Sequence, residues 1–181
     1  GGDTPFTFTG DGTAGTVNGG TYRVHRFPYA AGASYDITFS QAGIIDALIC
    51  AGGGGGRGHL SNSNAYSGGG GGAGGLILQY SYGVTASTYS ITVGQGGYHT
   101  DGYGPYYYRS AFDDGDNSVF GSLTAVGGGA AGMGYTNPIE GYPGGSGGGG
   151  SHNSASANGA GIRNGGAATA SQGNDGGAGG C

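Results

Sequence analysis

Tyrosine-rich polar segments hold the residues of this chain that are best suited to chemistry. The sequence has 14 tyrosines among 181 residues. Tyrosine mixed with Ser, Gly, Asn and Arg is typical of antibody binding loops, in which each phenol gives a large contact area at a small entropic cost. We therefore predict that these segments recognise a partner surface. The predicted contact residues are Tyr98, His99, Tyr103, Tyr106, Tyr107, Tyr108 and Arg109 in a first segment, Arg57, His59 and Tyr66 in a second, and Tyr135 and Tyr142 in a third.

A fourth polar segment has a similar composition. It contains His152, Asn153, Asn158 and Arg163. The alternative interpretation of all these segments is structural, with the tyrosines closing over the ends of the glycine runs that separate them. Both interpretations are compatible with the sequence.

Metal and cofactor chemistry finds little support in the acidic and histidine residues. The densest acidic cluster, Asp113–Ser118, resembles half of a calcium loop but lacks the spaced ligands and the closing glutamate. We interpret it as a solvated turn whose Asp and Asn side chains cap their own backbone. The histidines show no metal-ligand spacing; they are His25, His59, His99 and His152. We expect no metal and no cofactor.

Catalysis and nucleic-acid binding are also disfavoured. The chain has no lysine, so the glycine runs cannot form a P-loop, and Glu140 is its only glutamate. We therefore expect no enzymatic activity. Charged residues make up only 8% and the net charge is −5, which argues against the cationic surface that nucleic acid requires. No stretch is long and apolar enough to suggest membrane insertion.

Glycine runs separate the polar segments from short apolar ones. Glycine accounts for 51 residues, with runs at 52–56, 68–72, 127–129 and 147–150. Such a glycine content is often a sign of disorder. The many aromatic residues, and the grouping of apolar residues into segments of strand length, favour an ordered chain instead.

Three β-strands are predicted in the first fifty residues. Tyr22–Phe27 is a plausible strand, and Tyr35–Phe39 alternates, with its odd-numbered residues on one face. Ile44–Cys50 is nearly all apolar, which predicts a central strand covered on both faces. Cys50 should then be a buried free thiol, and a disulfide with Cys181 could form only in an oxidising compartment.

The glycine runs themselves predict an unusual backbone arrangement. An α-helix is disfavoured by about 1 kcal/mol per glycine, whereas a left-handed threefold helix suits glycine but needs hydrogen bonds from neighbouring chains. We predict an all-β plus polyglycine II fold, in which short strands feed a packed bundle of glycine-rich left-handed helices, with no substantial α-helix. Residues 1–50 would form a β-strand region and residues 51–181 the bundle with its polar loops, in one continuous module.

The order of motifs along the chain adds a family resemblance. The series runs through Phe8–Gly12, Ile45–Gly56, Gly70–Leu76, Tyr89–Gly97 and Asn117–Gly129. It resembles the glycine-rich domain at the ends of bacteriophage tail fibres and in related virion proteins. More distantly, it is similar to the glycine-rich extracellular domain of receptor tyrosine kinases of the anaplastic lymphoma kinase type, which usually has more cysteines.

The tail-fibre resemblance implies a function for the polar segments. It implies β-strands that feed a sandwich of polyglycine II helices, and distal loops that bind host receptors. We accordingly expect an adhesin on the virion surface that binds a host-surface glycan or outer-membrane protein, contacts other virion proteins and is oligomeric through its parent fibre. The alternative is a structural subunit of a capsid decoration or extracellular filament, whose loops make subunit contacts.

Overall fold

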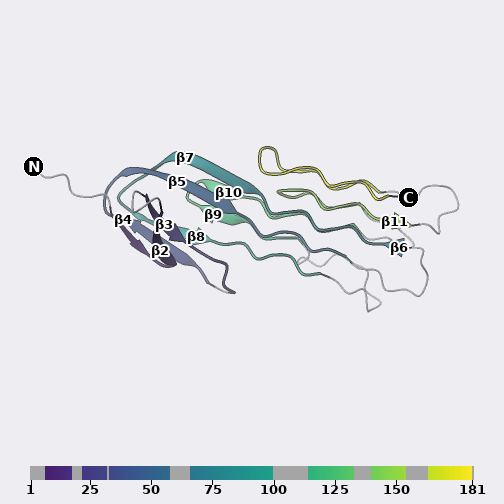
Figure 1. The fold of residues 1–181 in the computed structure, drawn as a ribbon, viewed down its shortest axis with the longest axis horizontal. Helices are drawn as coiled ribbons and strands as arrows, with labels where there is room; N and C mark the ends of the chain where they lie inside the picture. Colours follow the sequence, from purple (N-terminus) through teal and green to yellow (C-terminus); the bar gives the residue numbers. More distant parts are fainter. Residues whose placement is uncertain are drawn as a thin grey trace, which may run out of the picture.

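Most of the antiparallel strands lie at one end of the molecule, and extended glycine-rich segments make up the other (Figure 1). The structure is a computed structural model that describes residues 7–17, 22–31, 33–57, 66–99, 114–132, 140–153 and 163–180. Over these ranges the chain is all-β and forms no helix, as expected from its sequence. No helix in these ranges could therefore cross a membrane.

The larger sheet has five antiparallel strands in the order β1-β4-β8-β9-β10. Their bounds are β1 Phe8–Gly10, β4 Tyr35–Phe39, β8 Thr88–Thr92, β9 Ser118–Phe120 and β10 Leu123–Ala125. The predicted strand Tyr35–Phe39 is confirmed, since Ile37 and Phe39 are buried while Asp36 and Thr38 are exposed. Alternation of apolar and polar residues correctly indicated which face of β4 meets the core.

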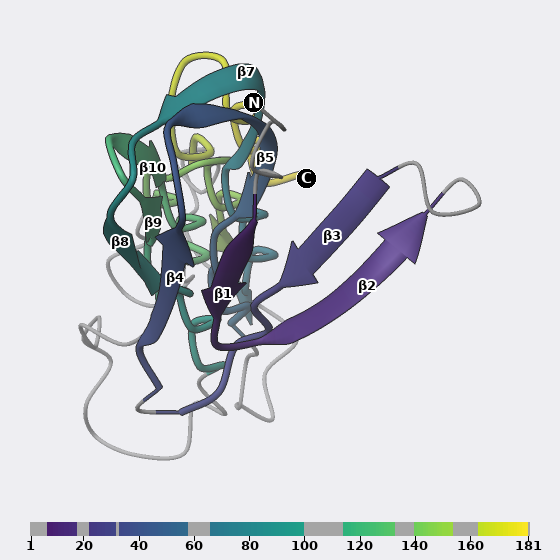
Figure 2. The same ribbon diagram turned by 90° about the vertical axis from the view of Figure 1, so that its left-hand side faces the viewer.

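Three strand pairs complete the β structure. The pairs are β5 Gly43–Cys50 with β7 Leu76–Val84, β2 Thr13–Val17 with β3 Tyr22–Arg26, and β6 Tyr66–Ser67 with β11 His152–Asn153. Viewed from the sheet end, the β2–β3 ribbon projects away from the other strands (Figure 2). The predicted strand at Tyr22–Phe27 thus exists as β3 and ends one residue earlier.

The hydrophobic core lies between the five-stranded sheet and the β5–β7 pair. Its buried members are Ile37, Phe39, Ile49, Val84, Ile91, Phe120 and Ala125. Aromatic rings meet within it, as Tyr89 lies 5.5 Å from Phe120 and 5.7 Å from Phe39 between ring centroids. Each large apolar side chain buried here contributes roughly 1.5–3 kcal/mol, so this core holds the sheets together.

β5 differs from the prediction. We predicted a central strand covered on both faces, but its burial alternates, and Ile44 and Leu48 are 69% and 65% exposed. Among the described strands β5 pairs only with β7. Cys50 lies on the same outward side, so its thiol is free as predicted but exposed rather than buried. A continuous apolar run does not reveal that only one of its two faces is covered.

Backbone hydrogen bonds join the glycine-rich segments at every third residue. The N–H groups of Ala51, Gly54 and Arg57 donate to the carbonyls of Gly75, Gly72 and Gly69 over 3.0, 2.8 and 3.2 Å. The N–H groups of Gly69, Gly72 and Gly75 donate in turn to Gly132, Gly129 and Val126 over 3.0, 2.8 and 2.7 Å. Side chains of a β-strand repeat every two residues, so the interval of three sets these segments apart from the sheets.

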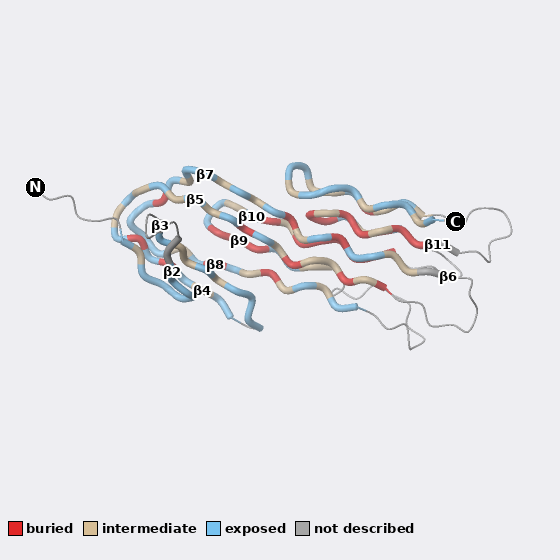
Figure 3. Tube along the Cα trace, viewed as in Figure 1, coloured by how far each residue is buried: buried red, intermediate tan, exposed pale blue. Residues whose placement is uncertain are grey.

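The middle segments of the glycine-rich part are closely packed. Residues 127–132 are buried throughout, whereas residues 173–180 are mostly exposed (Figure 3). A Cβ added to Gly148 would meet the carbonyl of Ala130 well inside van der Waals contact. Only hydrogen fits there, so the interior of this part is made largely of backbone.

Candidate recognition end

The described residues that flank the second, third and fourth polar segments lie side by side at one end of the glycine-rich part, away from the large sheet. Hydrogen bonds link the described residues that flank them: Gly69 N–H to Gly132 O at 3.0 Å, Gly132 N–H to Gly149 O at 2.8 Å, and Arg163 N–H to Ser151 O at 3.1 Å. β6 and β11 mark this end in Figure 1. We call it the recognition end, defined by Arg57, Tyr66, Gly132, Ser151 and Arg163.

A short strand pair joins the second and fourth polar segments at this end. β6 and β11 run antiparallel, with Tyr66 opposite Asn153 and Ser67 opposite His152. These segments are far apart in sequence, and no sequence signal predicted that they pair. The pair fixes Tyr66 and His152 in neighbouring backbone positions.

A cation–π contact joins the second and third polar segments. The guanidinium carbon of Arg57 lies 5.9 Å from the centre of the Tyr142 ring, within the range of this interaction. Arg57 is only 6% exposed, and both residues make further interactions. Arg57 therefore packs inside the recognition end, and little of its side chain is accessible to a binding partner.

Tyr98 and His99 are presented on the surface. Tyr98 is 59% exposed, and its hydroxyl accepts a 2.7 Å hydrogen bond from the Gln95 amide nitrogen. The other end of that amide accepts a 2.7 Å bond from the Tyr29 hydroxyl. Sequence reasoning did not select Tyr29 or Gln95, because 66 positions separate them and no local pattern links them.

The remaining predicted contact residues lie outside the described ranges. They are His59, Tyr103, Tyr106, Tyr107, Tyr108, Arg109 and Tyr135. The described residues on either side of them belong to the segments that hydrogen bonds hold side by side. These seven positions stay predictions.

The acidic cluster has a structural role that differs from the prediction. Asp114 Oδ1 accepts a 2.8 Å bond from the N–H of Ala130, and Asn117 Oδ1 accepts one of the same length from Gly127. These two bonds therefore cap the backbone of another segment, which the prediction of a local turn did not include. Within the described ranges no group of three or more His, Cys, Asp or Glu side chains could hold a metal ion.

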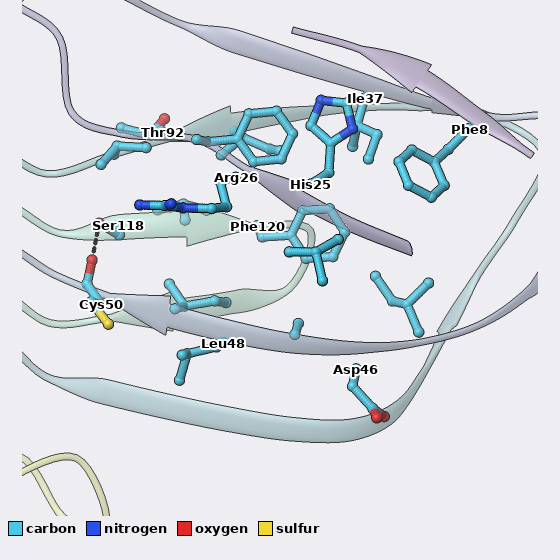
Figure 4. A pocket seen from close by; sticks show the side chains of 18 of the residues that line it. Phe8, His25, Arg26, Ile37, Asp46, Leu48, Cys50, Thr92, Ser118 and Phe120 are labelled. Atoms are coloured by element: carbon cyan, nitrogen blue, oxygen red, sulfur yellow. Dashed lines mark hydrogen bonds between the residues drawn. The ribbon is translucent and has the colours of Figure 1, made fainter. Parts of the chain in front are cut away.

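A cavity of about 660 Å³ lies away from the recognition end, between the sheets and β3. Its lining is mainly apolar and includes Ile37 and Phe120, with His25 and Arg26 contributed by β3 (Figure 4). His25 stacks on Phe27 with 4.9 Å between ring centroids. The space belongs to the hydrophobic core region rather than to the polar segments.

Together these features define an all-β protein whose sheets continue into glycine-rich segments joined through their backbones. The chain belongs to the glycine-rich domain family, whose model matches residues 30–181. No curated protein and no solved structure matches the chain. β1, β2 and β3 therefore lie before the matched region, and β1 extends the sheet of the family domain by pairing with β4.

Proposed function

We propose that this chain is a receptor-binding module of a virion-surface fibre that recognises a host-cell glycan or outer-membrane protein. The observation that supports the proposal best is that the described residues flanking the second, third and fourth polar segments lie side by side at one end of the molecule. Clustering of segments that are distant in sequence is how binding loops build one surface on a rigid scaffold. On this proposal the module has no catalytic role.

The scaffold is, on this proposal, a bundle of polyglycine II helices. The three-residue interval of the backbone hydrogen bonds matches the three residues per turn of that helix. Positive φ in the described ranges is confined to Gly12, Gly121, Ser81 and Ser171, so the glycine runs keep the sign of φ that a left-handed threefold helix requires. Close backbone packing would make the bundle stiff and hold the recognition end in one shape.

Recognition would rest on many shallow contacts made by tyrosine, histidine and asparagine. Only 8% of residues are charged, so strong ion pairs are few and a single module should bind weakly. Several copies carried by one fibre would raise the overall affinity without any new contact. Other virion proteins would then be the carriers of the module, and host-cell surfaces its targets.

Adsorption to host cells tests this proposal. We expect the triple substitution of Tyr106, Tyr107 and Tyr108 by serine to reduce adsorption of the chain by tenfold or more. A loss of this size is typical when aromatic hot-spot residues are removed from an interface. Thr124→Asp, an exposed change on β10, is the control and should adsorb normally. Full adsorption by a folded triple variant would refute these contact residues.

The mass of the protein in dilute solution tests the function class separately. A discrete small assembly that adsorbs to cells is the expected result. A stable polymer or lattice that does not adsorb would instead show a structural subunit, in which the same polar segments contact neighbouring copies.

A further inference from the structure

The outer face of the β5–β7 pair carries a patch of large exposed apolar side chains. Ile44 and Leu48 of β5 are 69% and 65% exposed, and Leu76, Leu78 and Tyr80 of β7 are 50%, 52% and 64% exposed. We call these five residues the β5–β7 patch. Exposed apolar patches of this kind mark interaction sites on soluble proteins.

Strand register places Leu48, Leu76 and Leu78 of the patch on one face. Leu48 lies directly opposite Leu78, and Cys50 opposite Leu76, so their side chains share a face. Figure 4 shows Asp46 and Leu48 directed to the other side of β5 from the core residues Ile37 and Phe120. The patch therefore faces away from the hydrophobic core, and the exposed thiol of Cys50 adjoins it.

We propose that the β5–β7 patch binds a second copy of this chain and forms a two-fold dimer. An aromatic side chain has roughly 150–250 Å² of surface. Five large side chains on this scale, each 50–69% exposed, therefore present roughly 500 Å² of apolar surface. A standard interface buries about 800 Å² per partner, of which about 65% is apolar in homodimers. The patch thus supplies about the apolar area that each half of a dimer needs.

The charges on this face are compatible with self-association. Each copy carries a net charge of −5, but Asp46 is the single charged residue of β5 and β7. Asp46 Oδ1 accepts a 2.9 Å hydrogen bond from the N–H of Ser81, so the carboxylate already has a partner. Two copies can therefore meet at the patch with little of the repulsion that acid-rich surfaces would cause.

A dimer of this kind leaves the recognition end open. β5 and β7 lie with the large sheet, while β6 and β11 lie at the opposite end of the molecule (Figure 1). Two-fold contact through the same patch on both copies closes on itself and does not propagate into a filament. The dimer would therefore present two recognition ends.

Sedimentation velocity over a wide range of protein concentration tests the proposal. The unmodified chain should dimerise, and Leu48→Asp and Leu78→Ser should each weaken the dimer by roughly tenfold or more. Thr124→Asp adds a charge to an exposed strand of the other sheet and should leave the dimer intact. Asp46→Asn keeps an acceptor for Ser81 and removes the like charge, so it should strengthen the dimer.

Cross-linking at Cys50 gives an independent measurement. In a Cys181→Ser background, a short bismaleimide should link two copies through Cys50, and Leu48→Asp should abolish the product. Far-UV circular dichroism checks that each variant is folded. A chain that stays monomeric at every concentration, or a dimer that Leu48→Asp leaves unchanged, would overturn the proposal, and a dissimilar protein bound to the patch of a monomeric chain would do the same.

Discussion

The carbonyl of Gly129 occupies the space that a side chain on Gly54 would need. A Cβ built on Gly54 would lie well inside van der Waals contact of that carbonyl. The same carbonyl accepts a 2.8 Å hydrogen bond from the N–H of Gly72. Three segments thus converge at one point, and glycine is required there by close approach rather than by backbone conformation.

Gly54→Ala should therefore destabilise the protein strongly. We expect the free energy of unfolding to fall by about 1–3 kcal/mol, the usual range for overpacking, because backbone atoms cannot move aside as a flexible side chain can. Gly53→Ala is the matched control in the same run, since its nearest atoms are Gly72 O at 3.5 Å and Gly74 N at 3.8 Å. Thermal unfolding would show a lower Tm for Gly54→Ala alone, and equal Tm values would contradict the backbone packing.

Asp114→Ala should remove a cap from the interior of the glycine-rich part. Ala130 is fully buried, and without Asp114 Oδ1 its N–H would lose a 2.8 Å acceptor. Leaving a buried donor unsatisfied costs about 1–3 kcal/mol in the free energy of unfolding. Asp116→Ala is the control because Asp116 is exposed.

Added calcium should not change the Tm of the unmodified chain. A clear calcium-dependent rise in Tm would instead support the interpretation of residues 113–118 as a calcium loop.

Arg57→Met should uncouple the second and third polar segments. The change keeps much of the buried volume but removes the cation over the Tyr142 ring. A double-mutant cycle with Tyr142→Leu should give a coupling free energy of about 0.5–2 kcal/mol. The cycle with Tyr142→Phe should show little coupling, since phenylalanine keeps the aromatic face. Strictly additive effects of Arg57→Met and Tyr142→Leu would mean that the two residues do not interact.

The variant Tyr98→Phe tests whether the exposed Tyr98 hydroxyl contributes to receptor binding independently of its effect on stability. The variant loses the 2.7 Å hydrogen bond from the Gln95 amide but keeps its ring, so the free energy of unfolding should change by less than about 1.5 kcal/mol. If the Tyr98 hydroxyl contacts a receptor, adsorption should weaken severalfold. Tyr29→Phe loses the other 2.7 Å bond of the same Gln95 side chain and lies outside the predicted contact set. Equal adsorption by both variants would remove Tyr98 from that set.

Alternation of apolar and polar residues along the chain predicts some strands of the fold correctly but is misleading for others. β4 was predicted from its alternation of Tyr35, Ile37 and Phe39 with polar residues, because the pattern itself records which face is buried. β5 has apolar residues on both faces, so its sequence looks like a strand buried on both sides. The exposed face carries the patch, and an interaction surface is the kind of place where local rules are expected to mislead.

The contacts within the glycine-rich part and at its recognition end could not be predicted, for a different reason. Tyr98 was selected on composition, which needs no knowledge of its neighbours. The Arg57–Tyr142 contact, the β6–β11 pair and the capping of Ala130 by Asp114 all join residues that only the completed fold brings together. Polar side chains can bond equally well to near and distant backbone, so the sequence of 113–118 indicates a local turn and gives no sign of the long-range caps that Asp114 and Asn117 form.

The threefold hydrogen bonding also has a consequence for the order of folding. Gly147 and Gly150 donate to Asn174 and Gly177, and Leu76 donates to Gln172. Segments synthesised early therefore cannot complete their hydrogen bonds until later segments have been synthesised. Contacts between residues that are far apart in sequence also form slowly during folding. Stepwise folding of the glycine-rich part behind the ribosome is accordingly disfavoured. We expect one slow, cooperative transition after the last of these segments has emerged.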